Sequence, residues 1–486
     1  MAKNIMIQGT MSNAGKSLLC AGLCRLFHQD GYRVAPFKSQ NMALNSFITR
    51  KGGEMGRAQV VQAEACGKEA DVRMNPILLK PTTDKGSQVI VNGHARASLS
   101  AMEYMKRKKE YIPAILEAYD SLAAENDIIV IEGAGSPAEI NLKQADIVNM
   151  GLAKMVDAPV VLVGDIDRGG VFAQLYGTLA LLSEEERRRV KATVVNKFRG
   201  DVEILRPGLD TLVDLCRVPV LGVLPYLNVE IEDEDSLSDR LQSRTLRKPI
   251  DIAVIRLPRL SNFSDFTPLE HFENVSVRYI RRTDEFYRPD LLILPGTKST
   301  IEDLLWLRQS GLEAKLRQYV ARGGILLGIC GGYQMLGKEI LDPDHVESPR
   351  EDRVEALGYL DFSTEFCGEK VQKQSQGRLN SVGGPLEALS GQEYFGYEIH
   401  MGRSRETLPV LSQAGNIYGT YLHGFFDTPD LLEKLLRSLC ERKGISFDNR
   451  HFDLAAFKEE QYDKLAQGVR ENLDMDLLYR IVEGRA

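Results

Sequence analysis

The stretch Gly9-Thr10-Met11-Ser12-Asn13-Ala14-Gly15-Lys16-Ser17 decides the expected fold of the first half of the chain. It follows an apolar run at residues 4–7 and precedes an apolar helical stretch at residues 18–27. This is the strand, loop and helix order of a phosphate-binding loop, in which backbone N–H groups and the helix N-terminus point at phosphate oxygens. The loop is one residue longer than the usual GxxxxGK(S/T) pattern, but its context supports the same role. The stretch therefore predicts a P-loop nucleotide site.

Side chains in and near this loop supply the expected contacts to nucleotide and metal. Lys16 should reach the β- and γ-phosphates, and the Ser17 hydroxyl should ligate Mg²⁺. Glu132 ends an apolar run at residues 127–131 and is placed as a second metal ligand, because parallel strands present their carboxyl ends to the ligand crevice. Asn196 closes another predicted strand and is expected either to meet the adenine edge or to cap a helix. The predicted nucleotide contacts are Gly9, Thr10, Asn13, Ala14, Gly15, Lys16, Ser17 and Asn196, with Ser17 and Glu132 as Mg²⁺ ligands.

Short apolar runs alternate with helical patterns through both halves of the chain. Strands of this length separated by amphipathic stretches predict βαβ units and mostly parallel sheets, which makes the fold class α/β. A charged stretch with little apolar content and a proline predicts a linker between two such series. The expected domains are 1–230 and 251–440, joined by a linker at 231–250 and followed by a helical tail at 441–486.

Composition narrows the class of protein. The 486 residues are 43% hydrophobic and carry a formal net charge of −7, so large cores are expected and the basic excess of a nucleic-acid binder is missing. No apolar run approaches the roughly 18 residues of a membrane span. The seven cysteines are never spaced as CxxC, which disfavours a disulfide framework or a zinc site. With no export signal at the N-terminus, a cytoplasmic protein without nucleic-acid or membrane partners is expected.

A cysteine in the second half has the surroundings of a nucleophile. Residues 325–329 form a strand-like run that leads into Cys330-Gly331-Gly332, which gives G-x-C-x-G at a strand-to-helix turn. Such an elbow needs glycines because backbone segments come very close together, and the following helix N-terminus favours the thiolate. The Gly331 N–H should face a developing oxyanion, and Gly296, at the end of another strand-like run, is expected to supply a second donor.

A cysteine nucleophile requires a base, and two histidines are candidates for it. His423 follows a strand-like run at residues 416–422 in the same domain. His400 is the alternative, and its neighbours suit it better to lining a pocket. We therefore expect His423 to be the base, although a histidine chosen at random is more often structural.

These motifs resemble two known families. Residues 328–334 with 421–424 resemble the triad-class glutamine amidotransferases, in which cysteine attacks the glutamine amide and ammonia leaves. The P-loop with its extra residue resembles dethiobiotin synthetase. Both halves together resemble the CobB/CobQ-type glutamine amidotransferases, in the branch that makes adenosylcobyric acid, and the stretches at 36–42, 75–81 and 87–91 add to this likeness.

The resemblance implies a fold, a reaction and its reactants. The expected fold is a dethiobiotin synthetase-like P-loop domain with a parallel sheet, followed by a flavodoxin-like triad-class amidotransferase domain. The implied reaction amidates the b, d, e and g carboxylates of adenosylcobyrinic acid a,c-diamide, each activated by ATP and Mg²⁺ as an acyl phosphate. Cys330 and His423 would supply ammonia from L-glutamine, with Gly296, Gly331 and Gln334 as oxyanion and glutamine contacts. The corrinoid is a substrate, no tightly bound organic cofactor is expected, and a homo-oligomer is left open.

A polycarboxylate substrate calls for cationic and amide side chains near the ATP site. Direct contact and a structural role are equally expected for each candidate. The candidates are Lys38, Gln40, Asn41, Lys80 and Lys85.

One position departs from the resemblance, and two alternative functions remain. Many triad amidotransferases have a glutamate two residues after the histidine, where this chain has Phe425, so a Cys-His dyad is expected and Asp427 is not assigned as a replacement. The first alternative is cobyrinic acid a,c-diamide synthase, a sibling that amidates other ring positions. The second is a ParA/MinD-like switch ATPase with a non-catalytic glutaminase-like module. Switch ATPases of that kind have a lysine early in the loop, where this chain has Thr10-Met11.

Overall fold

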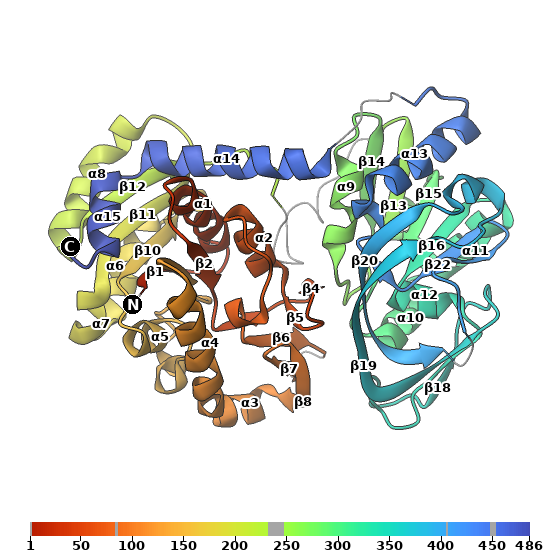
Figure 1. Ribbon diagram of the computed structural model, residues 1–486, viewed down its shortest axis with the longest axis horizontal. Helices are drawn as coiled ribbons and strands as arrows, with labels where there is room; N and C mark the ends of the chain where they lie inside the picture. Colours follow the sequence, from red (N-terminus) through yellow and green to blue (C-terminus); the bar gives the residue numbers. More distant parts are fainter. Residues whose placement is uncertain (1, 83–85, 232–246, 405–406, 448–452) are drawn as a thin grey trace.

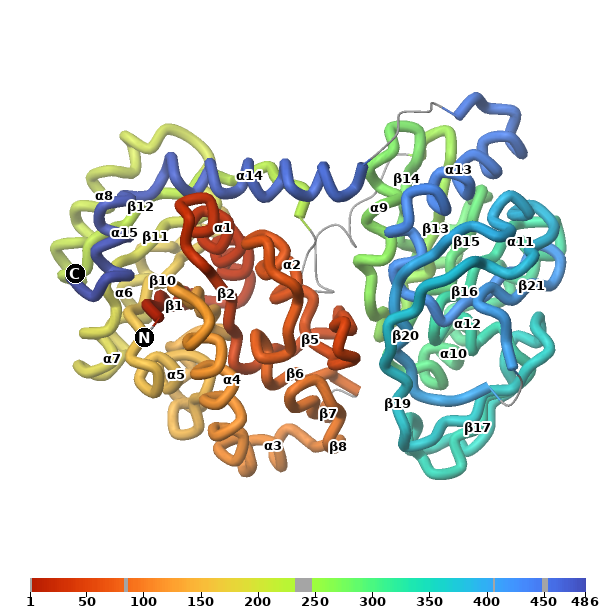
Figure 2. Tube along the Cα trace, viewed as in Figure 1, coloured from red at the N-terminus to blue at the C-terminus, as the bar shows by residue number. Residues whose placement is uncertain are grey.

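Two α/β units lie side by side in the computed structural model (Figure 1). The structure describes residues 2–82, 86–231, 247–404, 407–447 and 453–486. The linker predicted at 231–250 falls mostly on residues 232–246, which lie outside the described residues. Helix α14 (Leu454–Asn472), near the C-terminus, runs back across the N-terminal unit (Figure 2).

The N-terminal unit is built on a six-stranded sheet in the order β12-β11-β10-β1-β9-β2, in which every neighbouring pair is parallel. Helices cover both faces of a parallel sheet, so its strands are apolar throughout, and all five residues of β9 are buried. The carboxyl ends of β1 and β9 meet at one edge, where the P-loop and Glu132 lie. The strands are β1 (Lys3–Gly9), β2 (Val34–Phe37), β9 (Ile128–Glu132), β10 (Val160–Asp165), β11 (Val190–Phe198) and β12 (Val220–Pro225).

Helices and two small sheets complete this unit. One small sheet has the order β3-β6-β7-β8, and β4 pairs with β5 in a separate hairpin beside the C-terminal unit. The small-sheet strands are β3 (Gln40–Met42), β4 (Ser46–Ile48), β5 (Glu54–Gly56), β6 (Ile77–Pro81), β7 (Gly86–Val91) and β8 (His94–Ser100). The helices are α1 (Lys16–Gln29), α2 (Arg57–Ala65), α3 (Ala101–Arg107), α4 (Ile112–Glu125), α5 (Met150–Met155), α6 (Val171–Leu181), α7 (Glu184–Arg189) and α8 (Val202–Cys216).

The C-terminal unit has its own six-stranded sheet, in the order β14-β13-β15-β16-β22-β21, with only β21 antiparallel to its neighbour. Two parallel sheets with helices confirm the predicted α/β class. The strands are β13 (Ile250–Ile255), β14 (Val275–Ile280), β15 (Leu291–Leu294), β16 (Ile325–Ile329), β21 (Ser412–Ala414) and β22 (Ile417–Thr420). The helices are α9 (Thr267–Glu270), α10 (Thr300–Gln309), α11 (Leu312–Ala321), α12 (Gly331–Leu336) and α13 (Pro429–Lys443).

A second sheet in this unit carries a long hairpin toward the N-terminal unit. Its order is β18-β17-β19-β20-β23, and β19 pairs antiparallel with β20. In Figure 1 this hairpin forms the side of the unit that faces β4 and the small sheets. The strands are β17 (Glu339–Leu341), β18 (Arg353–Glu355), β19 (Ser363–Arg378), β20 (Glu393–Ser404) and β23 (Leu422–His423).

The C-terminal tail packs on the N-terminal unit. Helices α14 and α15 (Met475–Val482) bury Leu465, Val469 and Ile481 in the same core as helix α1. A Cβ added at Gly22 of α1 would lie 2.8 Å from Val469 Cγ2, so the two helices touch closely. The periodicity of the tail predicts a packed helix, but it does not show which unit the helix covers.

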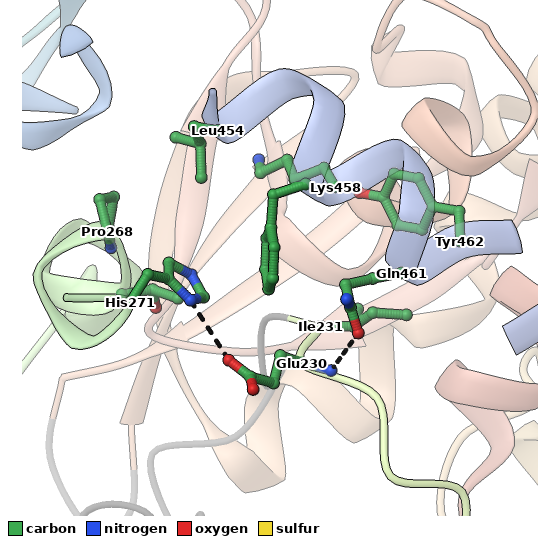
Figure 3. A pocket seen from close by; sticks show the side chains of 10 residues that line it. Glu230, Ile231, Pro268, His271, Leu454, Lys458, Gln461 and Tyr462 are labelled. Carbon is green, nitrogen blue, oxygen red and sulfur yellow. Dashed lines mark hydrogen bonds and ion pairs between the residues drawn. The ribbon is translucent and has the colours of Figure 1, made fainter. Parts of the chain in front are cut away.

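A small cavity of about 20 Å³ marks the point where α14 starts and the two units meet (Figure 3). His271, just after α9, pairs with Glu230 at 3.2 Å, and its ring lies 4.3 Å from that of Phe457. The Glu230 backbone N–H donates to Gln461 Oε1 at 3.0 Å. The C-terminal unit is thereby joined both to the chain before the linker and to α14.

Candidate active site

The P-loop connects β1 to α1 and turns sharply at Gly15, whose φ is 91°. The left-handed backbone favours glycine here, and a Cβ at Gly15 would lie 2.1 Å from Asn196 Nδ2 and displace that side chain. The Lys16 ammonium donates to the carbonyl oxygens of Met11 at 3.1 Å and Gly135 at 3.2 Å. These bonds hold the lysine over the loop, from where its ammonium can turn to phosphate oxygens.

Neighbouring strands and helices brace the same loop. Asn196, in β11, donates to Ala14 O at 2.8 Å. The Thr10 hydroxyl donates to Gln174 Oε1 at 3.1 Å, and the Lys197 ammonium donates to Asn13 O at 2.6 Å. Asn196 therefore supports the loop backbone in this structure, and its contact with adenine stays a prediction.

Glu132 is buried at the end of β9 and accepts four side-chain hydrogen bonds. Ser17 Oγ and Lys38 Nζ each donate to Oε1 at 2.8 Å. Gln62 Nε2 donates to Oε2 at 2.6 Å, and Gln59 Nε2 donates to the same oxygen at 3.3 Å. Because all four partners donate to its two oxygens, the Glu132 carboxyl group is held at a fixed position.

These side chains fit a Mg²⁺ ion that binds together with a nucleotide. The Ser17 hydroxyl and the Glu132 carboxylate are hard oxygen donors 2.8 Å apart. Mg²⁺ in phosphate-transfer sites takes one or two protein oxygens, and phosphates and water supply the rest. Ser17 and Glu132 are therefore the residues that would hold the ion, as the sequence predicts.

Three of the predicted substrate contacts lie on the P-loop side of the molecule and are already bonded to protein. Lys38 forms an ion pair with Glu132, at the end of β9. Gln40 Oε1 accepts from the Tyr104 hydroxyl at 2.6 Å, and Asn41 Nδ2 donates to Gln59 Oε1 at 2.9 Å. Contact of these three residues with a corrinoid stays a prediction.

Lys80 is brought to a different place from the one the sequence suggests. It pairs with Glu54 at 2.8 Å, Glu54 also pairs with Lys370 of the C-terminal unit, and Lys80 lines the pocket that contains Cys330. It was expected near the ATP site, and sequence alone could not reveal that β6 leads to the contact between units. Lys85 lies outside the described residues.

Cys330 sits on a strained turn between β16 and α12, with φ 50° and ψ −109°. A Cβ at Gly332 would lie 1.9 Å from Leu294 O, and one at Gly328 would lie 2.8 Å from Gly332 O. Both flanking glycines are therefore required by close backbone contact, as expected for a nucleophile elbow. The residue is only 6% exposed and lines a cavity of about 40 Å³, and its thiol donates to Ile399 O at 3.3 Å.

The two predicted oxyanion-donor residues lie against this elbow. A Cβ at Gly296 would lie 3.6 Å from Cys330 Cβ and 3.2 Å from His423 Cε1. A Cβ at Gly331 would lie 3.1 Å from the backbone nitrogen of Thr297. The loop after β15 and the start of α12 thus surround the thiol, and the identity of the donor N–H groups stays a prediction.

His423 is fully buried and is oriented by an aspartate, so the expected Cys-His dyad is wrong. Its Nδ1 lies 2.7 Å from Asp265 Oδ2, and the ring lines the same cavity as Cys330. Burial opposes the charged imidazole, but Asp265 and Cys330 together raise the pKa of His423 to about 10. The Gly424 backbone N–H donates to Asp265 Oδ1 at 3.2 Å and fixes the carboxylate. A third member of the constellation is therefore present.

The sequence pattern did not reveal Asp265 because the usual position two residues after the histidine holds Phe425. Asp265 belongs to a 3-10 turn at Phe263–Phe266, 158 residues before its partner. The available signal was an acid shortly after a parallel strand, β13, in the same sheet as β16. That is the edge at which ligand-facing side chains gather.

Gln334 and His400 line the same cavity as the thiol. Gln334 Nε2 donates to Met401 O at 2.9 Å, and its Oε1 accepts from the Thr300 hydroxyl at 3.3 Å. The His400 ring stacks on Tyr421 with centroids 3.9 Å apart, and its Nδ1 lies 3.0 Å from Gly402 O. His400 is thus held as part of the pocket wall, and His423 is the imidazole that Asp265 orients in the same cavity as the cysteine.

The turn that carries Asp265 is held by the N-terminal unit. Asn262 Nδ2 donates to Ser46 O at 2.9 Å, and Ser264 Oγ donates to Asn45 Oδ1 at 3.0 Å. The Tyr397 hydroxyl donates to the same Ser46 carbonyl at 3.0 Å, while its ring stacks on His423. The segment that follows β3 therefore contacts the turn that carries Asp265 and the tyrosine that stacks on the imidazole.

A P-loop unit joined to a cysteine elbow with histidine and aspartate defines a glutamine amidotransferase that carries its own nucleotide-binding domain. A family model for the CobB/CobQ-like glutamine amidotransferase domain matches residues 251–431, and one for the CobQ/CobB/MinD/ParA nucleotide binding domain matches residues 5–236. A cobyric acid synthase of Lachnoclostridium phytofermentans is 57% identical, over 99% of this chain and 99% of its own length. One of Ruminiclostridium cellulolyticum is 56% identical, over 99% of this chain and 98% of its own. The chain belongs to the cobyric acid synthase family.

No helix among the described residues combines the length and the apolar character that crossing a membrane requires.

Proposed function

We propose that this protein uses ATP and L-glutamine to amidate the b, d, e and g carboxylates of adenosylcobyrinic acid a,c-diamide, which gives adenosylcobyric acid. The observation that carries the proposal is the presence, in one chain, of a P-loop and of a Cys330 elbow whose His423 is bonded to Asp265. Similarity to cobyric acid synthases over nearly the whole chain supports this particular reaction over that of the sibling diamide synthase.

The C-terminal unit would release ammonia from glutamine. The Cys330 thiolate attacks the side-chain carbonyl carbon, and backbone N–H groups near Gly296 and Gly331 stabilise the oxyanion. The His423 imidazolium gives its proton to the leaving nitrogen, so that ammonia and a thioester form. His423 then takes a proton from the water that hydrolyses the thioester, and glutamate leaves. Asp265 keeps the imidazole oriented throughout and stabilises its charged form.

The N-terminal unit would activate the acceptor. Bound ATP with Mg²⁺ supplies a phosphoryl group that turns a poorly electrophilic carboxylate into an acyl phosphate with a good leaving group. Lys16 would neutralise charge on the transferred phosphate, and Ser17 with Glu132 would fix the metal. Ammonia then attacks the acyl carbon and phosphate departs. Because water also attacks acyl phosphates, the two units must keep the reacting carbon away from solvent.

The division of labour is tested by Cys330→Ala. This variant is expected to lose glutamine-dependent amidation and to keep amidation from ammonium salts, because the P-loop and Glu132 are untouched. Product formation is followed by mass spectrometry of the corrinoid with either nitrogen source. Equal loss with glutamine and with ammonia would overturn the proposal.

A further inference from the structure

The pocket around Cys330 contains an ammonium and a carboxyl group, those of Lys298 and Glu347, for which the described residues supply no ion-pair partner. Five charged side chains outside the His423–Asp265 pair belong to it or touch it, namely Lys80, Lys298, Lys370, Glu54 and Glu347. Lys80 and Lys370 both pair with Glu54. Within the part of the chain that the structure describes, the Lys298 ammonium has neither a hydrogen bond nor an ion pair.

Lys298 is carried by the loop that forms one wall of the elbow. It directly follows Gly296 and Thr297, and its backbone N–H donates to Arg259 O at 3.0 Å. Its side chain is within electrostatic reach of Cys330 and of Glu347. The loop that lies against the reacting sulfur therefore also presents a cation to the same cavity.

Glu347 faces the same cavity from the chain after β17. Its Oε1 accepts the backbone N–H of Ile301 at 2.8 Å, in the first turn of α10. That bond fixes the carboxyl group beside the loop that carries Lys298, and it leaves the other carboxyl oxygen for a ligand. Thr300 and Gln334 complete this end of the pocket.

Both side chains are partly buried in the wall of the cavity. Burial raises the pKa of Glu347 to about 8, and burial together with Lys80 lowers the pKa of Lys298. A buried charge is favourable only with a partner of opposite sign. A ligand that carries one carboxylate and one ammonium would supply both missing partners at once.

We propose that Lys298 and Glu347 form a clamp for the amino-acid end of glutamine, Lys298 binding the α-carboxylate and Glu347 the α-ammonium. The inference rests on the proposed function, since it concerns the substrate of Cys330. The side-chain amide must lie at the thiol, and the α-carbon is three bonds further along the substrate. The clamp therefore selects a free amino acid and rejects glutamine whose α-groups are blocked, as in a peptide.

The test compares hydrolysis of three compounds, namely L-glutamine, L-glutaminamide with an uncharged α-carboxamide, and Nα-acetyl-L-glutamine with an uncharged α-nitrogen. Lys298→Met should raise KM for glutamine about 10- to 100-fold with little change in kcat, since charged hydrogen bonds of this kind are lost. It should also abolish the preference for glutamine over glutaminamide while the preference over the acetyl compound persists. Glu347→Gln should show the reverse pattern, with the preference over Nα-acetyl-L-glutamine lost.

The controls separate a clamp from damage to the fold. Lys315→Met removes an exposed lysine of α11 in the same unit and should leave all three preferences unchanged. Lys298→Arg keeps the charge and should restore the preference over glutaminamide, and amidation from ammonium salts should stay normal in every variant. Lys298→Arg also serves if Lys298→Met proves misfolded. An arginine variant that folds but does not discriminate against glutaminamide would overturn the proposal.

Two results distinguish the clamp from the function on which it rests. A wild-type protein that hydrolyses glutamine but treats glutaminamide and the acetyl compound equally well refutes the clamp alone. A wild-type protein that hydrolyses none of the three, even with corrinoid and ATP present, refutes the proposed function as well.

Discussion

Replacing Asp265 by Asn removes one negative charge from beside His423 and leaves the shape of the site intact. The asparagine oxygen can still accept the Gly424 N–H, which now lies 3.2 Å from Oδ1. Its amide group, however, can only donate to His423 Nδ1, where Asp265 now accepts. The imidazole would then hold its neutral-state proton on Nε2, which is the wrong tautomer for accepting a proton there.

The size of the effect follows from the hydrogen bond that is lost. A buried hydrogen bond between charged groups contributes about 1.5–3 kcal/mol. Because each 1.36 kcal/mol is a factor of ten in rate, glutamine hydrolysis should fall by about 10- to 150-fold. The wrong tautomer adds to this loss, so the estimate is a lower bound. Amidation from ammonia should be unchanged.

The pH dependence gives a second readout of the same change. The pKa of His423 is raised to about 10, so the imidazolium persists at neutral pH and is lost only as pH rises through that value. Without Asp265 the pKa falls toward the ordinary value of about 6.5. The alkaline limb of the kcat/KM profile, which reports the free enzyme, should therefore move down by several pH units in Asp265→Asn.

The assay is glutamate release over a range of glutamine concentrations with corrinoid and ATP present, so that kcat/KM is obtained from pH 6 to about 10. Asp427→Asn is the matched control, because Asp427 shortly follows His423 in the sequence and its replacement removes the same charge. It should keep both the rate and the profile. An Asp265→Asn variant with wild-type rate and an unmoved alkaline limb would refute the orienting role.

Two further changes probe the N-terminal unit and its contact with the glutaminase. Lys16→Ala should stop amidation with glutamine or with ammonia, because both sources need the activated carboxylate; normal turnover in saturating ammonia would count against a phosphate-binding lysine. Asn262→Ala removes the bond to Ser46 that holds the aspartate-bearing turn. It should lower glutamine hydrolysis several-fold and leave ammonia-dependent amidation intact, and an unchanged glutaminase rate would show that this contact does not position the turn.

Local motifs allowed much of the fold and part of the site to be predicted from sequence. The P-loop and the elbow depend on short-range rules, because glycine spacing, a preceding strand and a following helix lie within about ten residues of each other. The same rules placed Ser17 and Lys16, and the alternation of apolar runs predicted the parallel sheets. Glu132 could be predicted as a metal ligand because it ends a strand that pairs with β1.

Long-range contacts account for what the sequence did not reveal. Asp265 acts on a histidine far along the chain, from an irregular turn without a hydrophobic period. Lys80 pairs with a carboxylate that also binds the other unit, so its position depends on how the two units dock. The partner of α14 likewise depends on tertiary packing, since an amphipathic helix shows that one face is buried but not against what.

The most direct test of the account follows nitrogen from donor to product. The protein is incubated with adenosylcobyrinic acid a,c-diamide, ATP, Mg²⁺ and glutamine labelled with ¹⁵N at the side-chain amide. The mass of the corrinoid product is then measured by mass spectrometry. We expect adenosylcobyric acid with all four new amide nitrogens labelled, and no product when ATP is omitted. A corrinoid that gains no labelled nitrogen, while the protein still hydrolyses ATP, would contradict the account.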